Sequence, residues 1–127
     1  MAIAANFFLQ GEAQEEAYLR AYFGEPAGEG SEYRRSRFYL MRQVLSVFYT
    51  ALLLLEASRA GQSIDAELTT PDFRDYHQDL IADKIDMLTP EAKVEYGMLH
   101  LREALRNMRT VRFEESLARV RGAHASE

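Results

Sequence analysis

The stretch FYLMRQVLSVFYTALLLL, from Phe38 to Leu55, decides the fold of this chain. Its polar residues are few, namely Arg42, Gln43, Ser46 and Thr50. Neither Gly nor Pro occurs between Ser31 and Ala60, which favours one continuous helix. The second half of the run is apolar on every side, so a single amphipathic stripe does not describe it. The pattern therefore predicts that other helices surround this one and bury it.

Composition and charge narrow the class of protein. A chain of 127 residues with 47% hydrophobic content suits one domain, so we expect a single helical domain over residues 1–127 with a frayed tail at 123–127. The absence of Cys excludes disulfides, Cys-ligated zinc and thiol catalysis, and it fits a reducing cytoplasm, which is the predicted location. A net charge of −5 argues against a general nucleic-acid binder. We therefore predict no nucleic-acid partner.

The C-terminal part of the chain is locally basic. From His100 to Gly122 there are six Arg against three Glu. Charges at helical spacings are typical of a solvated helix face. The alternative is a basic surface that meets an acidic partner.

The apolar run must also be weighed as a membrane segment. A bilayer needs about 20 mostly apolar residues, and this run is shorter and contains Arg42. Charged residues flank it on both sides, and no basic region precedes a hydrophobic core at the N-terminus, so a secretory signal is not apparent. We predict a buried helix and no membrane partner, with membrane insertion or surface association as the alternative.

Gly and Pro divide the rest of the chain into helices. Residues 11–23 carry acids early and precede Gly24, which is typical of a helix and its stop. Thr70-Pro71 and Thr89-Pro90 each combine a capping hydroxyl with Pro at the first helical position. A last helix is expected at about 111–121, and residues 2–9 form a short apolar opening segment. The predicted fold is all-α, with about five helices packed round one long buried central helix at about 31–60.

One string in the sequence resembles a catalytic motif. The string from His77 to Lys84 looks like the kinase-type loop His-x-Asp-x-x-x-x-Asn, but Lys84 stands where that chemistry places a metal-holding Asn, and the string lies within a helical pattern. The paired Glu-x-x-His motifs of di-iron bundles do not occur. We predict no catalytic residue, no metal and no cofactor, and no enzyme activity for the chain on its own.

Aromatic residues are the remaining candidates for a binding site. The chain has seven Tyr and seven Phe. Their ring faces can line a pocket for a cationic small molecule. The alternative is that they fill the core, with the Tyr hydroxyls reaching the surface or a buried acceptor.

Several stretches resemble the helical C-terminal part of the aminoglycoside phosphotransferase and choline kinase-like superfamily. The first is LRAYFGEP at 19–26, followed by YRRSRFYLMRQVLSVFYTALLLLEAS at 33–58, which is similar to a helix that ends in a Tyr-Phe-Gly-type turn before a long buried helix. The others are Asn6-Phe7-Phe8, which resembles the stretch after that family's magnesium-binding segment, and residues 96–117, which resemble its closing helices. The likeness covers most of the chain.

The resemblance implies a substrate-side helical subdomain of a small-molecule phosphotransferase. No residue of this sequence matches the family's ATP-binding lobe, catalytic Asp loop or magnesium Asp, so no catalytic role carries over. Ser46, Phe48 and Tyr49 stand where choline-kinase-like members place Trp and an acidic residue, which puts choline specificity in doubt. Within such a subdomain, the candidates for walling the acceptor pocket are Tyr39, Tyr49 and Tyr96.

The resemblance also bears on partners. A subdomain of this kind without its kinase core would expose an apolar face, so we expect either that missing core as a partner or a homo-oligomer. The alternative function is a free-standing all-α module for protein interaction or homo-oligomerisation.

Overall fold

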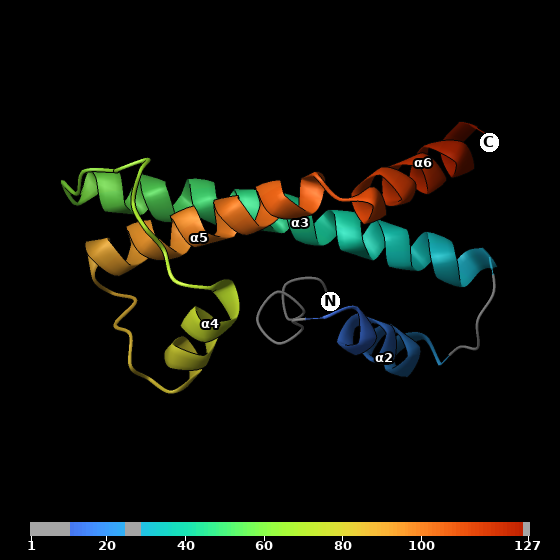
Figure 1. Cartoon of the computed structure of the whole chain (residues 1–127), viewed down its shortest axis with the longest axis horizontal. Helices are drawn as coiled ribbons and strands as arrows, with labels where there is room; N and C mark the ends of the chain where they lie inside the picture. The colour runs from blue at the N-terminus through green and yellow to red at the C-terminus, as the bar shows by residue number, and fades with distance from the viewer. Residues whose placement is uncertain (1–10, 25–28, 126–127) are drawn as a thin grey trace. The chain divides into compact units, whose positions relative to one another are not determined.

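The structure, a computed structural model, describes residues 11–24 and 29–125. Within these ranges it contains five α-helices and no strand (Figure 1). The helices are α2 (Glu12–Phe23), α3 (Glu29–Arg59), α4 (Phe73–Ile81), α5 (Pro90–Met108) and α6 (Val111–Ala125). The all-α fold with one long helix is confirmed. The predicted opening segment at residues 2–9 lies outside the described residues.

The chain divides into two compact units. Unit 1 consists of residues 1–45 and 106–127, and unit 2 consists of residues 46–105. The long helix α3 contributes its first part to unit 1 and its second part to unit 2.

Glycine ends two of the helices. Gly24 adopts a left-handed conformation with φ of 68°, and its N–H donates to the carbonyl of Arg20 at 2.8 Å. Gly61 also adopts a left-handed conformation, with φ of 84°, just after α3. Both stops follow from the freedom of Gly at positive φ, which other residues rarely adopt.

Polar residues cap α4 and α5, although not in both cases as predicted. Thr89 Oγ1 accepts from the N–H of Ala92 at 3.3 Å ahead of Pro90, which confirms the predicted start of α5. Helix α4 instead begins after Asp72, whose carboxylate accepts from the N–H of Arg74 at 2.9 Å. The prediction that Thr70 caps this helix is therefore wrong. A carboxylate is a strong cap because it also complements the helix dipole.

Helix α6 runs through Gly122 to Ala125 rather than ending near residue 121. The predicted frayed tail at 123–127 thus overlaps the last turn of the helix, and residues 126–127 lie outside the described part of the chain. Gly in a helix costs only about 1 kcal/mol relative to Ala, so a single Gly need not end one.

The buried side of α3 is a seam of polar and small residues. Its members recur at spacings of three and four, the pattern that faces a neighbouring helix. They are Ser36, Tyr39, Gln43, Ser46, Thr50 and Ala57. The polar members are hydrogen-bonded. In unit 1 the Gln43 side chain accepts from Asn107 Nδ2 at 3.1 Å, and in unit 2 the Thr50 hydroxyl lies 2.9 Å from the carbonyl of Gly97.

Gly97 explains why small residues suit this seam in unit 2. A Cβ built on Gly97 would lie 3.3 Å from the Leu54 side chain, so α5 approaches α3 closely at this point. Close packing then continues through a buried cluster of Ala57, Val94 and Met98. In unit 1 the core is smaller and contains Leu19 and Phe38, with Tyr18 stacked on Phe38 at 6.0 Å between ring centroids.

Candidate functional site

Unit 2 buries a cluster of aromatic rings and two histidines. His77 on α4 donates its Nδ1–H to the carbonyl of Phe73 at 3.0 Å. Its Nε2 is then free to accept the Tyr96 hydroxyl, also at 3.0 Å. Burial lowers the pKa of His77, against the opposing effect of the Phe73 carbonyl. The ring is therefore neutral near pH 7, with its tautomer set by these two hydrogen bonds.

The tyrosines of this cluster keep their protons at neutral pH. Tyr96 stacks on Tyr76 with ring centroids 5.5 Å apart. Burial raises the pKa of Tyr76 to about 12, and burial also raises the pKa of Tyr96. The Tyr96 hydroxyl is thus a hydrogen-bond donor to His77 rather than a phenolate.

His100 on α5 is the unusual member of the cluster. Only 1% of it is exposed, and neither ring nitrogen has a hydrogen-bond partner in the described part of the chain. Its ring lies 4.4 Å from that of Tyr96 and 5.3 Å from that of Phe73, centroid to centroid. Burial, followed by the neighbouring His77, lowers the pKa of His100 to about 4. A buried polar group without a partner costs about 1–3 kcal/mol, so the buried imidazole of His100 lowers the stability of the fold.

The cluster has the groups for proton transfer but not the access. An imidazole that accepts from a phenol is a general-base arrangement in principle. His77, Tyr96 and His100 are all buried, however, so a reacting molecule does not reach them without movement of α4 or α5. Sequence reasoning did not bring His77 and His100 together. They lie on different helices, so no local spacing joins them.

The three predicted pocket tyrosines lie in two different places. Tyr49 and Tyr96 both contact His100 in unit 2, with the Tyr49 ring 5.6 Å from it between centroids. Tyr39 lies in unit 1, where its hydroxyl donates to the carbonyl of Asn107 at 3.3 Å. The guanidinium of Arg112 covers the Tyr39 ring at 3.9 Å from the centroid. The structure thus brings Tyr49 and Tyr96 together in unit 2.

Unit 1 contains a buried carboxylate held by two arginines. Glu15 on α2 is almost fully buried, and each of its carboxylate oxygens accepts from a different guanidinium, one from Arg42 on α3 and one from Arg112 on α6. The Glu15 carboxylate thus joins three helices. Sequence reasoning missed this site because its members lie 27 and 97 positions apart along the chain.

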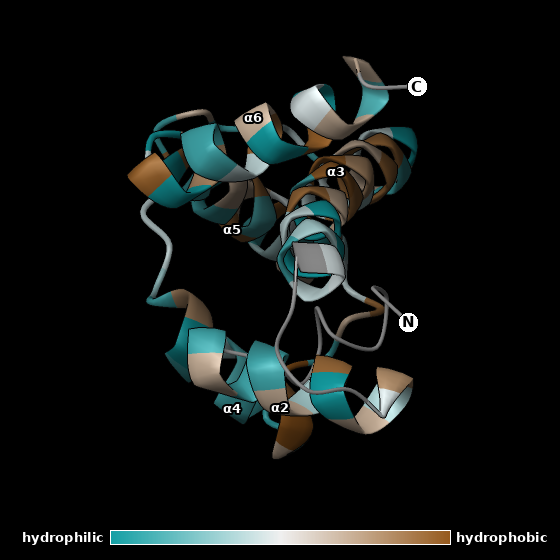
Figure 2. Cartoon of the chain, turned by 90° about the vertical axis from the view of Figure 1, so that its right-hand side faces the viewer, coloured by the Kyte–Doolittle hydropathy of each residue, from teal (hydrophilic) through white to brown (hydrophobic). Residues whose placement is uncertain are grey.

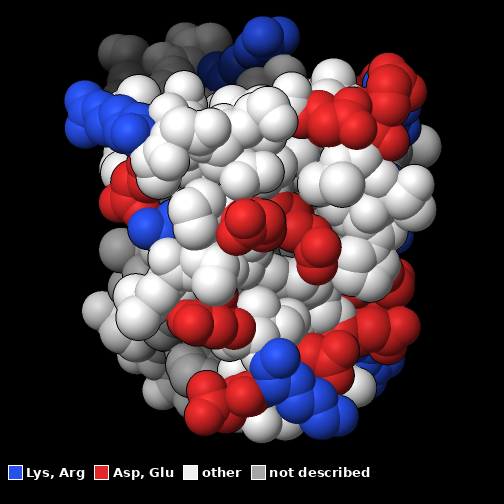
Figure 3. Space-filling view, turned by 90° about the vertical axis from the view of Figure 1, so that its left-hand side faces the viewer, with Lys and Arg blue, Asp and Glu red and all other residues white. Residues whose placement is uncertain are grey.

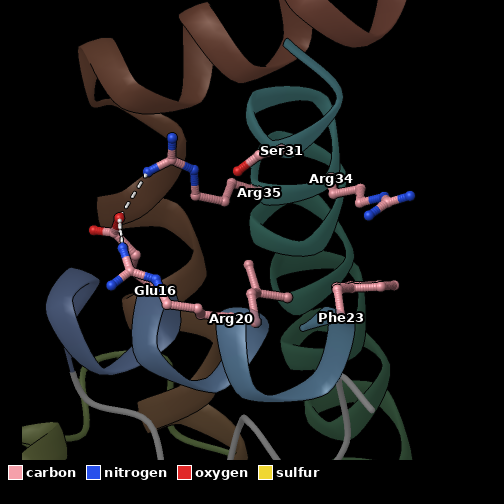
Figure 4. A pocket seen from close by; sticks show the side chains of 7 residues that line it. Glu16, Arg20, Phe23, Ser31, Arg34 and Arg35 are labelled. Atoms are coloured by element: carbon pink, nitrogen blue, oxygen red, sulfur yellow. Dashed lines mark hydrogen bonds and ion pairs between the residues drawn. The ribbon is translucent and has the colours of Figure 1, made fainter. Parts of the chain in front are cut away.

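Unit 1 contains two cavities, of which the larger is lined in part by Glu15 and Arg112. The smaller has a volume of about 30 Å³, and Figure 4 shows Glu16 there, joined to the side chains of Arg20 and Arg35. Arg34 lies over the ring of Phe23 at the other side, 4.6 Å from its centroid. The larger cavity has a volume of about 230 Å³ and is lined by charged side chains of both signs from α2, α3 and α6. Tyr39, Tyr49 and Tyr96 do not line either one.

Metal ligation finds no support in the described residues. In the ranges that the structure covers, no three His, Asp or Glu side chains gather in a way that would hold a metal ion. The histidines of unit 2 have aromatic neighbours, and the Glu15 oxygens are occupied by arginines.

The side of α3 away from the buried seam is apolar and exposed. Its large side chains are between 40% and 58% exposed, and Figure 2 shows α3 coloured as hydrophobic over much of its length. We call these residues the apolar stripe, namely Met41, Val44, Val47, Phe48, Leu52 and Leu55. We predicted that neighbouring helices bury α3 on every side. They bury the side that carries the seam, whereas the apolar stripe is exposed.

Length and composition alone make α3 a candidate membrane span. The segment Gly30–Arg59 has a mean hydropathy of 1.6, with 28% of the window buried within the chain. The core helix of a globular protein passes the same test. The stripe from Met41 to Leu55 rises about 21 Å, which is shorter than the hydrocarbon core of a bilayer at about 30 Å.

The two units differ in charge. Unit 2 carries eleven Asp or Glu and five Lys or Arg, a net charge of −6, whereas unit 1 carries nine and ten, a net charge of +1. The face in Figure 3 shows Asp and Glu side chains gathered among uncharged ones, with few Lys or Arg. The acidic excess of the chain therefore lies in unit 2.

Comparison with known proteins gives no family. No protein-family model, no curated protein and no solved structure matches this chain. Any function must therefore be argued from the residues and surfaces described above.

Proposed function

We propose that this chain is a helical docking module, which acts by packing the apolar stripe of α3 against another protein surface. The observation that carries the proposal is the arrangement of α3 itself. Ser36, Gln43, Ser46 and Thr50 are buried on one side of α3, and the six large side chains of the apolar stripe are 40–58% exposed on the other. Gln43 and Thr50 are hydrogen-bonded to neighbouring parts of their units. Contiguous exposed apolar surface of this kind typically marks an interaction site.

The sites buried inside the units support a module without chemistry of its own. The His77–Tyr96 pair is sealed from solvent, and the Glu15 carboxylate is engaged by two guanidiniums. Both arrangements serve to position helices. Packing within the chain, in contrast, does not account for the large apolar side chains that are exposed in the stripe.

Dye binding tests whether the stripe is available for docking. At submicromolar concentration we expect the folded chain to bind a hydrophobic dye such as anilinonaphthalene sulfonate, and Phe48→Glu to lose most of that fluorescence. The matched control is Leu88→Glu, which makes the same kind of change at an apolar side chain that is 84% exposed outside α3. Equal fluorescence from all three proteins would contradict a docking surface on α3.

A second candidate is the substrate-side subdomain of a small-molecule phosphotransferase. In this case the stripe would dock on an ATP-binding catalytic core. The specific support is that Tyr49 and Tyr96, two of the three residues expected to wall an acceptor pocket, converge on one buried histidine. Aromatic faces suit a cationic small molecule, which would have to open the buried cluster to reach them.

Thermal unfolding with a ligand panel tests this second candidate. A ligand that binds only the folded chain raises the melting temperature. We expect no shift with ATP–magnesium, because no residue here matches a nucleotide-binding loop. A shift with choline, ethanolamine or an aminoglycoside would support the phosphotransferase subdomain, and the absence of any shift would argue against it.

A further inference from the structure

We propose that the partner of the apolar stripe, for the chain by itself, is the same stripe of a second copy, with the two α3 helices antiparallel. This inference rests on the proposed docking function and names its partner. Three observations carry it, namely the spacing of the stripe, its area and the charge of the two units.

The spacing of the stripe matches a partner helix. Met41, Val44, Phe48, Ala51 and Leu55 recur at intervals of three and four along one uninterrupted helix, the spacing of a knobs-into-holes seam. Val47 and Leu52 widen this seam on its two sides. A straight helical seam is matched best by another helix. The stripe contains no charge, so its pairing with itself buries no like-charge contact.

The area of the stripe suits a weak pairing. A fully exposed aromatic side chain presents roughly 150 Å² or more and an aliphatic one somewhat less, so one Phe and five aliphatic side chains about half exposed present on the order of 400 Å². Two copies would then bury about 800 Å² in total, which is in the range of weak, transient interfaces and fits association at tens of micromolar. Met41 and Leu55 mark the ends of this surface, and Phe48 lies at its middle.

The charge of the two units selects the antiparallel direction. Parallel helices would set the −6 charge of unit 2 against the same charge in the partner. Antiparallel helices set the second part of α3, in unit 2, beside the first part of the partner's α3, in the unit of net charge +1. An isologous pairing with a two-fold axis near Phe48 satisfies both the seam and the charges.

Light scattering at increasing concentration tests the pairing. We expect a dimer at tens of micromolar for the unmodified chain and for Leu88→Glu, and a monomer for Phe48→Glu, with a loss of affinity of at least tenfold. Phe48 is 58% exposed, so the variant is expected to fold, which circular dichroism checks. If Phe48→Glu does not fold, Leu55→Glu replaces it, because Leu55 is also about half exposed.

Crosslinking tests the direction, since the chain contains no Cys. In an antiparallel pair Met41 opposes Leu55, so mild oxidation links the double variant Met41→Cys with Leu55→Cys but not single Met41→Cys. Formation of a disulfide dimer by the single variant would show parallel helices and overturn the stated arrangement.

The remaining outcomes separate the pairing from the docking function. A monomeric chain whose dye binding is lost in Phe48→Glu would overturn the pairing but keep a docking surface on α3. A monomer without stripe-dependent dye binding would overturn both. A monomer that floats with phosphatidylcholine–phosphatidylserine vesicles through the same stripe would overturn both in favour of a membrane surface.

Discussion

Replacement of Glu15 by Gln is expected to lower the free energy of unfolding by about 3 kcal/mol, since removal of one partner from a buried ion pair leaves uncompensated charge behind. The Glu15 side chain is 7% exposed and neutralises Arg42, at 14%, and Arg112, at 33%. Gln is close to Glu in shape, so the loss reports charge rather than volume. The estimate lies at the low end of the known range because Arg112 keeps partial access to water.

The matched control is Glu16→Gln in the same turn of α2. Glu16 is 44% exposed and pairs with the surface residues Arg20 and Arg35. Exposed ion pairs contribute about 0–1 kcal/mol, so this variant should unfold close to the unmodified chain in urea. A loss for Glu15→Gln no greater than that for Glu16→Gln would show that the buried carboxylate does not hold the three helices together.

The helices themselves were largely predictable because their ends depend on local chemistry. Gly24 stops α2 through its left-handed backbone, and Pro90 starts α5 after a capping Thr. The start of α4 was not predicted correctly, because two neighbouring cap residues compete there and the carboxylate of Asp72 is the better acceptor. The Thr70 hydroxyl instead accepts from Arg102 at 2.9 Å, a contact 32 residues away in sequence.

The environment of α3 was the harder inference. A run rich in large apolar residues predicts burial, and the long helix does form. In unit 2, however, the closest approach of α5 is to a side of α3 that contains small and hydrogen-bonding residues, because Gly97 and Thr50 let the two helices come together. The three-and-four spacing of the polar residues was present in the sequence. Hydrophobicity alone did not reveal which face packs inside the chain.

Local sequence patterns did not predict the candidate sites. In the sequence Glu15 is one of several acidic residues at the start of a helix. Only its ion pairs with arginines far away in the chain show that it differs from the others. His77 and His100 come together because α4 and α5 pack within unit 2. Tertiary contacts of this kind carry no signature in helix spacing, so buried charge pairs and buried polar groups without partners are apparent only in the folded structure.

Acidification from pH 7 to pH 4 is expected to destabilise unit 2 by about 3 kcal/mol through His100. The imidazole has a reference pKa near 6.5 in the unfolded chain and a pKa of about 4 in the folded chain. Between these values the unfolded state binds a proton that the folded state excludes, so stability falls as pH falls. At about 1.36 kcal/mol per unit of pKa, the loss is complete near pH 4, below which this residue adds no further slope. The pKa of His77 is lowered as well, which acts in the same direction.

Urea unfolding of His100→Leu across this pH range isolates the effect. Leu has a similar volume and needs no hydrogen bond, so the variant should be at least as stable at pH 7 and should lose most of the slope that His100 supplies. The groups that face His100 are His77 on α4, Tyr96 on α5 and Tyr49 on α3. His77 and both tyrosines remain in the variant, so a change in slope reports the imidazole of His100. His124→Leu, an exposed histidine on α6, is the control and should keep the slope. An unchanged slope in His100→Leu would mean that the orphaned imidazole reaches water in solution, and the buried cluster in unit 2 would then be open rather than sealed.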